Sequence, residues 1–282
     1  VLGRLLRIPV FATFQGGDRH LSRLEGLLRP LTLKACSGLI IAPQTEIERV
    51  HVKYEVPFSK IARIFNPIDL TMWSAADRSE TRAALDIPST ARVVIWHGRV
   101  DIHRKGLDIL LDAWKMVCQE HKGQDLRLLL VGTGIDAGEL HRRIKAMQLQ
   151  GVTWVDKYLI DRGAIRRYLS AADIYTLPSR HEGFPVAPIE AMACGLPVVA
   201  ADAPGVPDIL EDGEISGGIV VPRIDAKALA LALGRILDDM VWARKLGMRA
   251  RHRVETHFSL EKVGKQLRTF LSDRGAAITV DQ

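Results

Sequence analysis

The chain has 282 residues, of which 47% are hydrophobic and 26% are charged, a balance that is typical of folded proteins and excludes a wholly disordered chain. Its net charge of +6 suits anionic ligands, but no basic run is interleaved with aromatic residues, which argues against nucleic acid as a partner. The apolar runs are too short to span a bilayer. The three widely spaced cysteines, Cys36, Cys118 and Cys194, predict neither a disulfide framework nor a zinc site. This use of cysteine fits a reducing compartment.

The first part of the chain predicts a short segment of strands and one helix that ends at a turn signal, Asn66-Pro67-Ile68-Asp69. Strands are expected at 9–14, 38–42 and 61–65, and an amphipathic helix at 21–35. Residues 1–68 are fewer than the ~100–150 of a typical domain, so we expect an incomplete domain with an open sheet edge.

The helix expected at 21–35 carries Arg23, Arg29 and Lys34 beside several leucines. This pattern fits two environments. We favour packing of the helix against its own sheet, and the alternative is peripheral contact with an anionic membrane surface. Because the cysteines fit a reducing compartment, we expect a cytoplasmic protein. The second location that we consider is the inner face of the membrane, where the protein would be peripheral.

From residue 91 onward, short β-branched runs alternate with stretches in which apolar residues have helical spacing. This alternation predicts a parallel sheet covered by helices on both faces, a doubly wound α/β domain over 69–258. A final helix at 259–272 is expected to follow and to pack back on the first domain. Strands are expected at 92–96, 126–131, 152–155, 174–177, 198–200 and 218–221, and helices at 107–118, 137–147, 162–171, 186–194 and 225–237. Ligands of such sheets bind beyond the carboxyl ends of the strands.

Two acids stand eight residues apart after the strand expected at 174–177. Glu182 follows the carboxyl end of that strand, and Glu190 lies in the next helix, which we expect to start near Pro185. The free N–H groups at such a helix start can hold an anion. A carboxylate among apolar helix residues needs hydrogen-bond donors, and sugar hydroxyls are donors. In the alternative interpretation, Glu182 only complements the helix dipole and Glu190 lies on a solvated face.

A second cluster follows the strand expected at 92–96 and precedes a helix. Gly98 allows close backbone approach at the edge of the sheet. Arg99 and Lys105 would place two positive charges there, which predicts phosphate binding, although each could also be an ordinary surface cation. The turn Gly132-Thr133-Gly134 also stands at a strand end, but it lacks the spacing of a dinucleotide site or a P-loop.

In this order, these motifs resemble the carboxyl-terminal half of the family 4 glycosyltransferases, which have the GT-B fold of two Rossmann-like domains. The resemblance is carried by Gly98-Arg99, Lys105-Gly106, Gly132-Thr133-Gly134, the E-x7-E element from Glu182 to Glu190, and Gly195-Leu196-Pro197-Val198-Val199. It covers nearly the whole chain. It implies a GT-B-like α/β protein with a doubly wound, parallel-sheet carboxyl-terminal Rossmann-like domain for the nucleotide sugar and an incomplete amino-terminal Rossmann-like domain on the acceptor side.

The resemblance implies a retaining hexosyltransferase of polysaccharide or glycoconjugate biosynthesis. It would move a hexose from a UDP- or GDP-sugar to a glycan, lipid-linked or small-molecule acceptor, without a metal ion or other cofactor. Arg99 and Lys105 would neutralise the departing diphosphate, Glu182 would face the hydroxyls of the donor sugar, and Glu190 would accept hydrogen bonds from the ribose. The implied catalytic residues are Arg99, Lys105 and Glu182, and the implied donor-binding residues are Gly98, Gly132, Asp156, Gly183, Phe184, Pro185, Val186 and Glu190.

The chain departs from the family pattern at three places: the glycine-rich loop expected near the start of the first domain is absent from this sequence, and two motifs differ. Gln15 stands where many relatives carry a histidine. The Gln15 amide can form a hydrogen bond with a hydroxyl but cannot be protonated. Gln15 and Asp18 are our acceptor-side candidates. Pro204-Gly205-Val206-Pro207-Asp208 stands where relatives usually have Gly-Gly-x-x-Glu. Two other functions therefore stay open: a chain that binds a nucleotide sugar without transferring it and, less favoured, a nucleotide-sugar epimerase.

Overall fold

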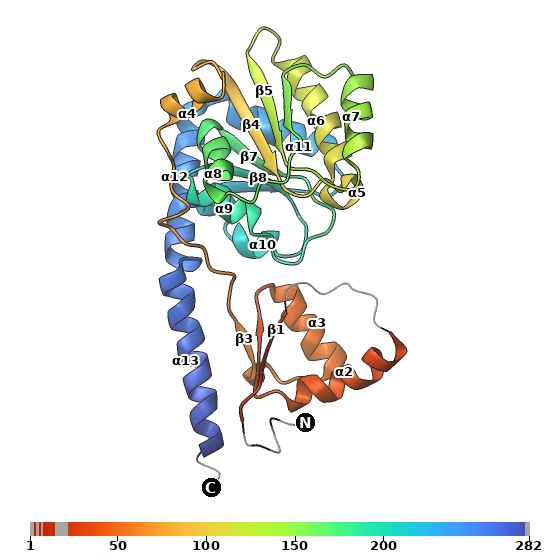
Figure 1. The fold of residues 1–282 in the computed structure, drawn as a ribbon, viewed down its shortest axis with the longest axis vertical. Helices are drawn as coiled ribbons and strands as arrows, with labels where there is room; N and C mark the ends of the chain where they lie inside the picture. Colours follow the sequence, from red (N-terminus) through yellow and green to blue (C-terminus); the bar gives the residue numbers. More distant parts are fainter. Residues whose placement is uncertain (1–2, 4–5, 7, 15–21, 280–282) are drawn as a thin grey trace.

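The computed structural model describes residues 3, 6, 8–14 and 22–279, with the backbone alone from 274 onward, and this part contains two sheets (Figure 1). The smaller sheet has the strand order β1-β2-β3, and the larger has the order β6-β5-β4-β7-β8-β9. Every strand pair in both sheets is parallel. The predicted α/β class with parallel sheets is therefore confirmed.

The smaller unit consists of strands joined by helices. Its elements are β1 (Phe11–Phe14), α2 (Arg23–Ala35), β2 (Gly38–Ile41), α3 (Gln44–Tyr54), the 3-10 turn η1 (Phe58–Lys60) and β3 (Ile61–Arg63). Ser22 starts α2 with a capping box, because its hydroxyl accepts from the Glu25 N–H at 3.2 Å while Glu25 accepts from the Ser22 N–H at 2.9 Å. The sequence analysis did not predict α3.

Helix α2 buries little of its apolar surface. Leu33 packs into the core of the smaller unit. Leu24, Leu27, Leu28 and Leu31 are between 45% and 72% exposed. The expectation that the leucines of this helix pack against their own sheet is therefore met by Leu33 and not by these four. Across the described residues, none of the helices combines the length and the apolar character needed to cross a bilayer.

The larger unit contains each strand and helix that the sequence predicted after residue 91, with ends shifted by at most a few residues. Its strands are β4 (Arg92–His97), β5 (Leu126–Val131), β6 (Val152–Val155), β7 (Ile174–Leu177), β8 (Val198–Ala201) and β9 (Gly218–Val221). Its helices are α4 (Arg78–Ala84), α5 (Ile102–Lys105), α6 (Leu107–Glu120), α7 (Ala137–Ala146), α8 (Arg162–Ala171), α9 (Ala187–Ala193), α10 (Val206–Ile209), the 3-10 turn η2 (Gly213–Ser216), α11 (Ala226–Asp238) and α12 (Met240–His257). The sequence analysis missed α4, α5, α10 and α12.

The core of the larger unit lies on both faces of its sheet, as β4 illustrates. Val93 and Ile95 belong to one buried cluster, together with residues of α8 and α9. Val94 and Trp96 belong to the other, together with residues of α6 and α11. Because successive side chains of a strand point to opposite faces, a strand buried on both faces must be apolar throughout. Because the faces of the sheet are apolar, polar side chains that bind a ligand are expected at the edge of the sheet where the strands end.

A buried ion pair joins α4 to the sheet. Arg82 Nη2 lies 2.8 Å from Asp173 Oδ2, and the two side chains are 5% and 2% exposed. The same carboxylate oxygen accepts from the Val93 N–H at 2.7 Å, and Arg78 contacts Asp173 as well. Arg82 also donates to the Ala91 carbonyl oxygen at 2.9 Å. These contacts hold the start of β7 beside the start of β4.

The chain crosses twice between the two units, and the two crossings are bonded to each other. Ile68, on the first crossing, forms a parallel bridge with Ser259 on the second. The Ile68 N–H donates to the Phe258 carbonyl at 2.7 Å, and the Leu260 N–H donates to the Ile68 carbonyl at 3.1 Å. Both passages of the chain therefore meet at one point.

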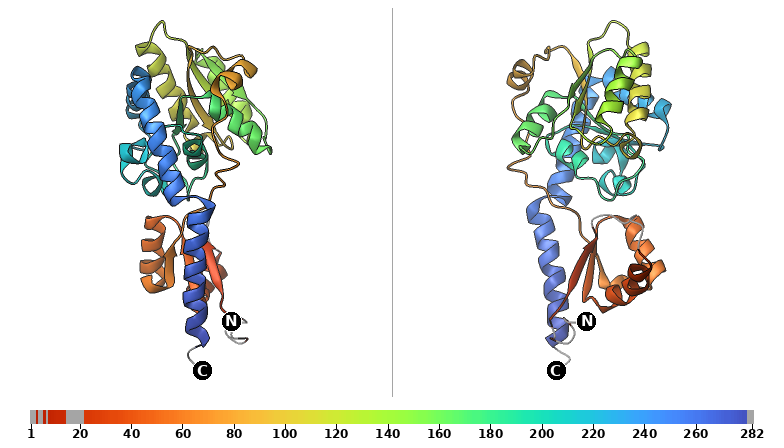
Figure 2. Two further views of the ribbon diagram at one scale, coloured as in Figure 1. Left: turned by 90° about the vertical axis from the view of Figure 1, so that its left-hand side faces the viewer. Right: turned by 45° about the vertical axis from the view of Figure 1, so that its right-hand side comes forward.

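The last helix, α13 (Leu260–Thr279), leaves the larger unit and runs beside the smaller sheet (Figure 2). The ring of Phe270 meets the ring of Phe11 edge-on, with centroids 5.7 Å apart. It also covers Gly38, where an added Cβ would come within 2.5 Å of the Phe270 ring. The carboxyl-terminal helix thus packs against β1 and β2 of the smaller sheet.

A further contact between the units is made by Asp208 of α10. Its Oδ1 accepts from the Gln44 N–H at 2.9 Å and from Arg63 Nη2 at 2.9 Å, and its side chain is 5% exposed. Asp208 is a position at which the chain departs from the family pattern. Its carboxylate is occupied by groups of the smaller unit.

Candidate functional site

The candidate residues lie at the carboxyl edge of the larger sheet, where β4 and β7 are neighbours. β4 ends at His97 and β7 at Leu177, and the chain leaves β4 toward β5 on one side and β7 toward β8 on the other. Ligands of open α/β sheets bind at such a switch in strand order. The segment after β4 carries Arg99 and Lys105, and the loop after β7 carries Glu182.

The segments after β4 and β7 are held together by the backbone. Gly106 has φ +64°, and an added Cβ there would lie 2.0 Å from the Pro178 carbonyl oxygen, so only glycine permits this approach. The Arg180 N–H donates to the Arg104 carbonyl at 3.0 Å. The Arg180 guanidinium forms a two-pronged pair with Asp108, at 2.7 and 2.8 Å. The two loops therefore form one rigid rim.

The predicted catalytic lysine and acid are in contact. Lys105 Nζ lies 2.7 Å from Glu182 Oε1, with side-chain exposures of 20% and 7%. The Ser179 hydroxyl donates to the same oxygen at 2.7 Å. An ammonium group is thus held at the sheet edge and still reaches solvent, which suits an incoming phosphate.

Glu190, in the first turn of α9, is bonded to His97. His97 Nε2 lies 2.9 Å from Glu190 Oε2, and the side chains are 7% and 20% exposed. Burial, and then the charges of Glu190 and Glu182, raise the pKa of Tyr175 well above its usual value. The Tyr175 hydroxyl therefore stays protonated. Because the charges of Glu190 and Glu182 both act on Tyr175, the two carboxylates lie in the same small region.

A cavity of about 180 Å³ lies at the ends of β4, β5 and β6, and His97, the partner of Glu190, is among its lining residues. Arg99 and Gly132 line it, together with Lys157 and Tyr158 from the loop after β6. Asp156, one of the predicted donor-binding residues, is not among its lining residues, and Asp156 Oδ2 lies 3.1 Å from His141 Nε2. The cavity indicates that the neighbouring Lys157 and Tyr158 are better placed to touch a ligand.

The helix after Glu182 starts close to its predicted position. The sequence predicted a start near Pro185, and α9 begins at Ala187, with Val186 as its N-cap and Pro188 in the first turn. The ring of Phe184, a predicted donor-binding residue, stacks on Phe65 with centroids 5.3 Å apart. Its side chain therefore packs near the crossing between the units, and only its backbone is available to a ligand there.

The two acceptor-side candidates, Gln15 and Asp18, lie outside the described residues. The sequence analysis did not assign the contacts made by His97 and Ser179. The signal that could have pointed to them is their position next to the ends of two adjacent strands, β4 and β7.

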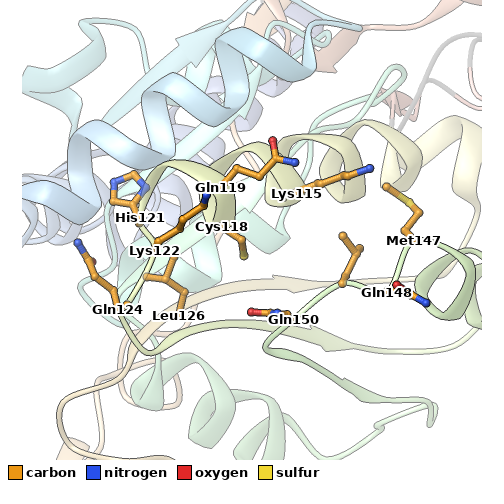
Figure 3. A pocket seen from close by; sticks show the side chains of 12 residues that line it. Lys115, Cys118, Gln119, His121, Lys122, Gln124, Leu126, Met147, Gln148 and Gln150 are labelled. Carbon is orange, nitrogen blue, oxygen red and sulfur yellow. The ribbon is translucent and has the colours of Figure 1, made fainter.

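A larger cavity of about 490 Å³ lies elsewhere (Figure 3). It is formed by the ends of α6 and α7 and the start of β5, and Lys115, Gln119 and Gln148 are among its lining residues. This is the amino edge of the sheet. It is therefore separated from the candidate site by the length of a strand.

A pH prediction follows from the pair of Arg180 and Asp108. Burial alone would raise the pKa of Asp108, but hydrogen bonds from Arg180 and its charge outweigh burial and hold that pKa below its usual value. A lowered folded pKa means that the pair contributes fully above the unfolded pKa of ~3.9 and is lost as the pH falls through the folded pKa. We expect the difference in Tm between the unchanged protein and Asp108→Asn to be constant above about pH 5 and to shrink below about pH 4. A difference that grows in acid would contradict this.

Comparison with known proteins gives both family and fold. Residues 91–239 match the family model described as Glycosyl transferases group 1. A GDP-mannose-dependent monoacylated alpha-(1-6)-phosphatidylinositol monomannoside mannosyltransferase of Corynebacterium glutamicum is 31% identical over 202 residues, which are 69% of this chain and 51% of that protein. Sucrose-phosphate synthase of Thermosynechococcus elongatus aligns with a TM-score of 0.79 and 28% identity, over 98% of this chain and 71% of that one. Anabaena Alr3699/HepE, in complex with UDP and glucose, aligns with a TM-score of 0.80 and 22% identity, over 96% and 73%.

These similarities confirm the resemblance stated from the sequence. The solved neighbours are GT-B glycosyltransferases, and the two parallel-sheet units of this chain have that fold. The chain spans about half the length of the curated relatives it matches, with 53%, 51% and 57% of three of them covered. Because the family model covers more than half of the 282 residues, the chain belongs to the glycosyl transferases of group 1.

Proposed function

We propose that this chain carries the donor site of a retaining hexosyltransferase, which moves a hexose from a UDP- or GDP-sugar to a glycan, lipid-linked or small-molecule acceptor without a metal ion. The observation that carries the proposal is the meeting of Lys105, Glu182 and Glu190 at the switch in strand order. The names of the relatives support it, since one is GDP-mannose-dependent and one neighbour was solved with UDP and glucose.

Lys105 and Arg99 supply the positive charge that a departing diphosphate needs. Lys105 is paired with Glu182 at 2.7 Å, whereas Arg99 is exposed beside the small cavity. An incoming diphosphate attracts both cations. Because these charges are fixed at the sheet edge, they stabilise the charge that develops on the leaving group.

The two carboxylates have different tasks. Glu182 accepts from Lys105 and from the Ser179 hydroxyl, so it is oriented at the side where the donor sugar enters. Glu190 is less buried, and one of its oxygens is bonded to His97. Its other oxygen can accept from the ribose hydroxyls, and a hydrogen bond to a charged acceptor contributes about 1.5–3 kcal/mol.

The test is calorimetric titration of the chain with UDP, GDP and ADP. We expect one nucleotide to bind and Glu190→Ala to weaken its binding at least ~10-fold, or about 1.4 kcal/mol. Glu139→Ala, on the exposed surface of α7, is the control and should bind as the unchanged protein does. If the chain binds none of the three nucleotides, or binds equally well without the Glu190 carboxylate, the proposal is wrong.

A second candidate is a chain that holds a nucleotide sugar without transferring the sugar. It is favoured by Gln15, which stands where many relatives carry a histidine and whose amide cannot be protonated. Incubation with the donor that binds, followed by product analysis by NMR, separates the two. Formation of any glycoside excludes the second candidate, and its anomeric configuration tests retention.

A further inference from the structure

His97 occupies a fixed place at the end of β4. Its side chain is 7% exposed, and its ring meets the Tyr175 ring edge-on with centroids 5.4 Å apart. The Tyr175 hydroxyl lies 3.5 Å from the His97 carbonyl oxygen. Since β4 and β7 are neighbours in the sheet, the ring is held by the core itself.

The two ring nitrogens of His97 have different surroundings. Nε2 lies 2.9 Å from Glu190 Oε2, whereas Nδ1 is buried and finds no hydrogen-bond partner in the part of the chain that the structure describes. A neutral imidazole carries one N–H, and only Nε2 faces an acceptor, so the pattern assigns the hydrogen to Nε2. His97 Nε2 therefore donates to Glu190 Oε2.

This single bond decides what Glu190 can do. It occupies Oε2 and leaves Oε1 without any bond to the described part of the protein. A free glutamate side chain samples several rotamers, and the bond from a rigid ring selects one of them. The bond therefore restricts the orientation of the carboxylate and leaves Oε1 as its open acceptor.

We propose that His97 is the positioning residue for Glu190: by donating from Nε2, it fixes the carboxylate so that the other oxygen receives the ribose hydroxyls of the nucleotide. The inference rests on the proposed function, because it needs a nucleotide in the site. His97 does not touch the nucleotide in this arrangement and acts through Glu190. A purely structural histidine would instead support the fold and leave the recognition of ribose unchanged.

The test compares ribose recognition in the unchanged chain and in two variants. UDP and GDP, and their 2′,3′-dideoxy counterparts, are titrated into the unchanged chain, His97→Leu and His97→Gln, whose amide places an N–H close to the position of Nε2. We expect the unchanged chain to prefer the ribonucleotide at least ~10-fold, His97→Leu to reduce the preference to ~2-fold or less, and His97→Gln to restore most of it. The ratio is taken within each variant, so a general loss of affinity cancels. His97→Asn, whose amide is too short to reach Glu190, replaces His97→Leu if that variant does not fold.

The outcomes separate the inference from the function on which it rests. An unchanged chain that binds neither nucleotide overturns the proposed function and the inference with it. A second outcome is that the unchanged chain prefers the ribonucleotide and His97→Leu keeps the full preference. This outcome overturns the positioning role alone. The same holds for His97→Asn where it replaces His97→Leu. Loss of the preference with recovery in His97→Gln supports the role, since a core defect would not be repaired by an amide.

Discussion

Replacement of Lys105 by alanine is expected to weaken the binding of nucleoside diphosphates by about 10- to 100-fold, because a hydrogen bond to a charged group contributes about 1.5–3 kcal/mol. Lys105 is the last residue of α5, which follows β4, and Lys105 Nζ lies 2.7 Å from Glu182 Oε1. Without it, the Glu182 carboxylate, 7% exposed, loses its counter-charge and repels the phosphates as well. The variant therefore loses an attraction and gains a repulsion.

Calorimetry with UDP or GDP and with the corresponding nucleoside measures this effect. Lys105→Ala should weaken binding of the diphosphate strongly and binding of the nucleoside little. Lys115→Ala is the matched control, since Lys115 lines the larger cavity at the opposite edge of the sheet (Figure 3). Equal losses for diphosphate and nucleoside would show that Lys105 supports the fold of the site and not the phosphates.

Replacement of Asp173 by alanine is expected to lower the free energy of unfolding of the larger unit by about 3–5 kcal/mol, because it leaves a buried charge without its counter-charge. That charge is Arg82, whose side chain is 5% exposed. The Val93 N–H, which donates to Asp173 at 2.7 Å, loses its acceptor too. The corresponding fall in Tm is about 6–20 °C for a unit of this size.

Thermal melts followed by circular dichroism measure this loss. Asp173→Asn keeps an acceptor for Val93 and should lose less stability than Asp173→Ala. Glu139→Gln, which breaks an exposed pair with Arg143, should leave the Tm nearly unchanged. If Asp173→Ala had the same Tm as Glu139→Gln, the buried pair would be unimportant for stability.

The elements that the sequence predicted are those with a continuous local signal. The strand Leu126–Val131 and the helix Arg162–Ala171 have the predicted ends. The strand is an apolar run that stops at Gly132, and the helix is preceded by Asp161, which accepts from the Gly163 N–H at 2.8 Å. Each signal lies within a few neighbouring residues.

The helix α12 was missed because its buried face is made largely of small residues. Ala243, Gly247 and Ala250 pack inward with Leu246, and several arginines stand between them. Such a stretch has little apolar contrast between its two faces, so its periodicity is weak. Close packing of small side chains becomes visible only when the neighbouring elements are in place.

The contacts of the site could be predicted only in part. Glu182, Glu190 and Lys105 were singled out by their places after predicted strands and by the family resemblance. The pairing of His97 with Glu190 spans 93 positions, and that of Arg82 with Asp173 spans 91. Both depend on β4 lying next to β7, an order of strands that no local pattern encodes.

The double crossing between the units has a mechanical consequence. Ile68 is hydrogen-bonded to both Phe258 and Leu260, so the two passages are tied to each other. Any movement of one unit against the other must therefore carry both passages together or break these bonds. A movement that separates the units must also break the contacts of Asp208 with Gln44 and Arg63.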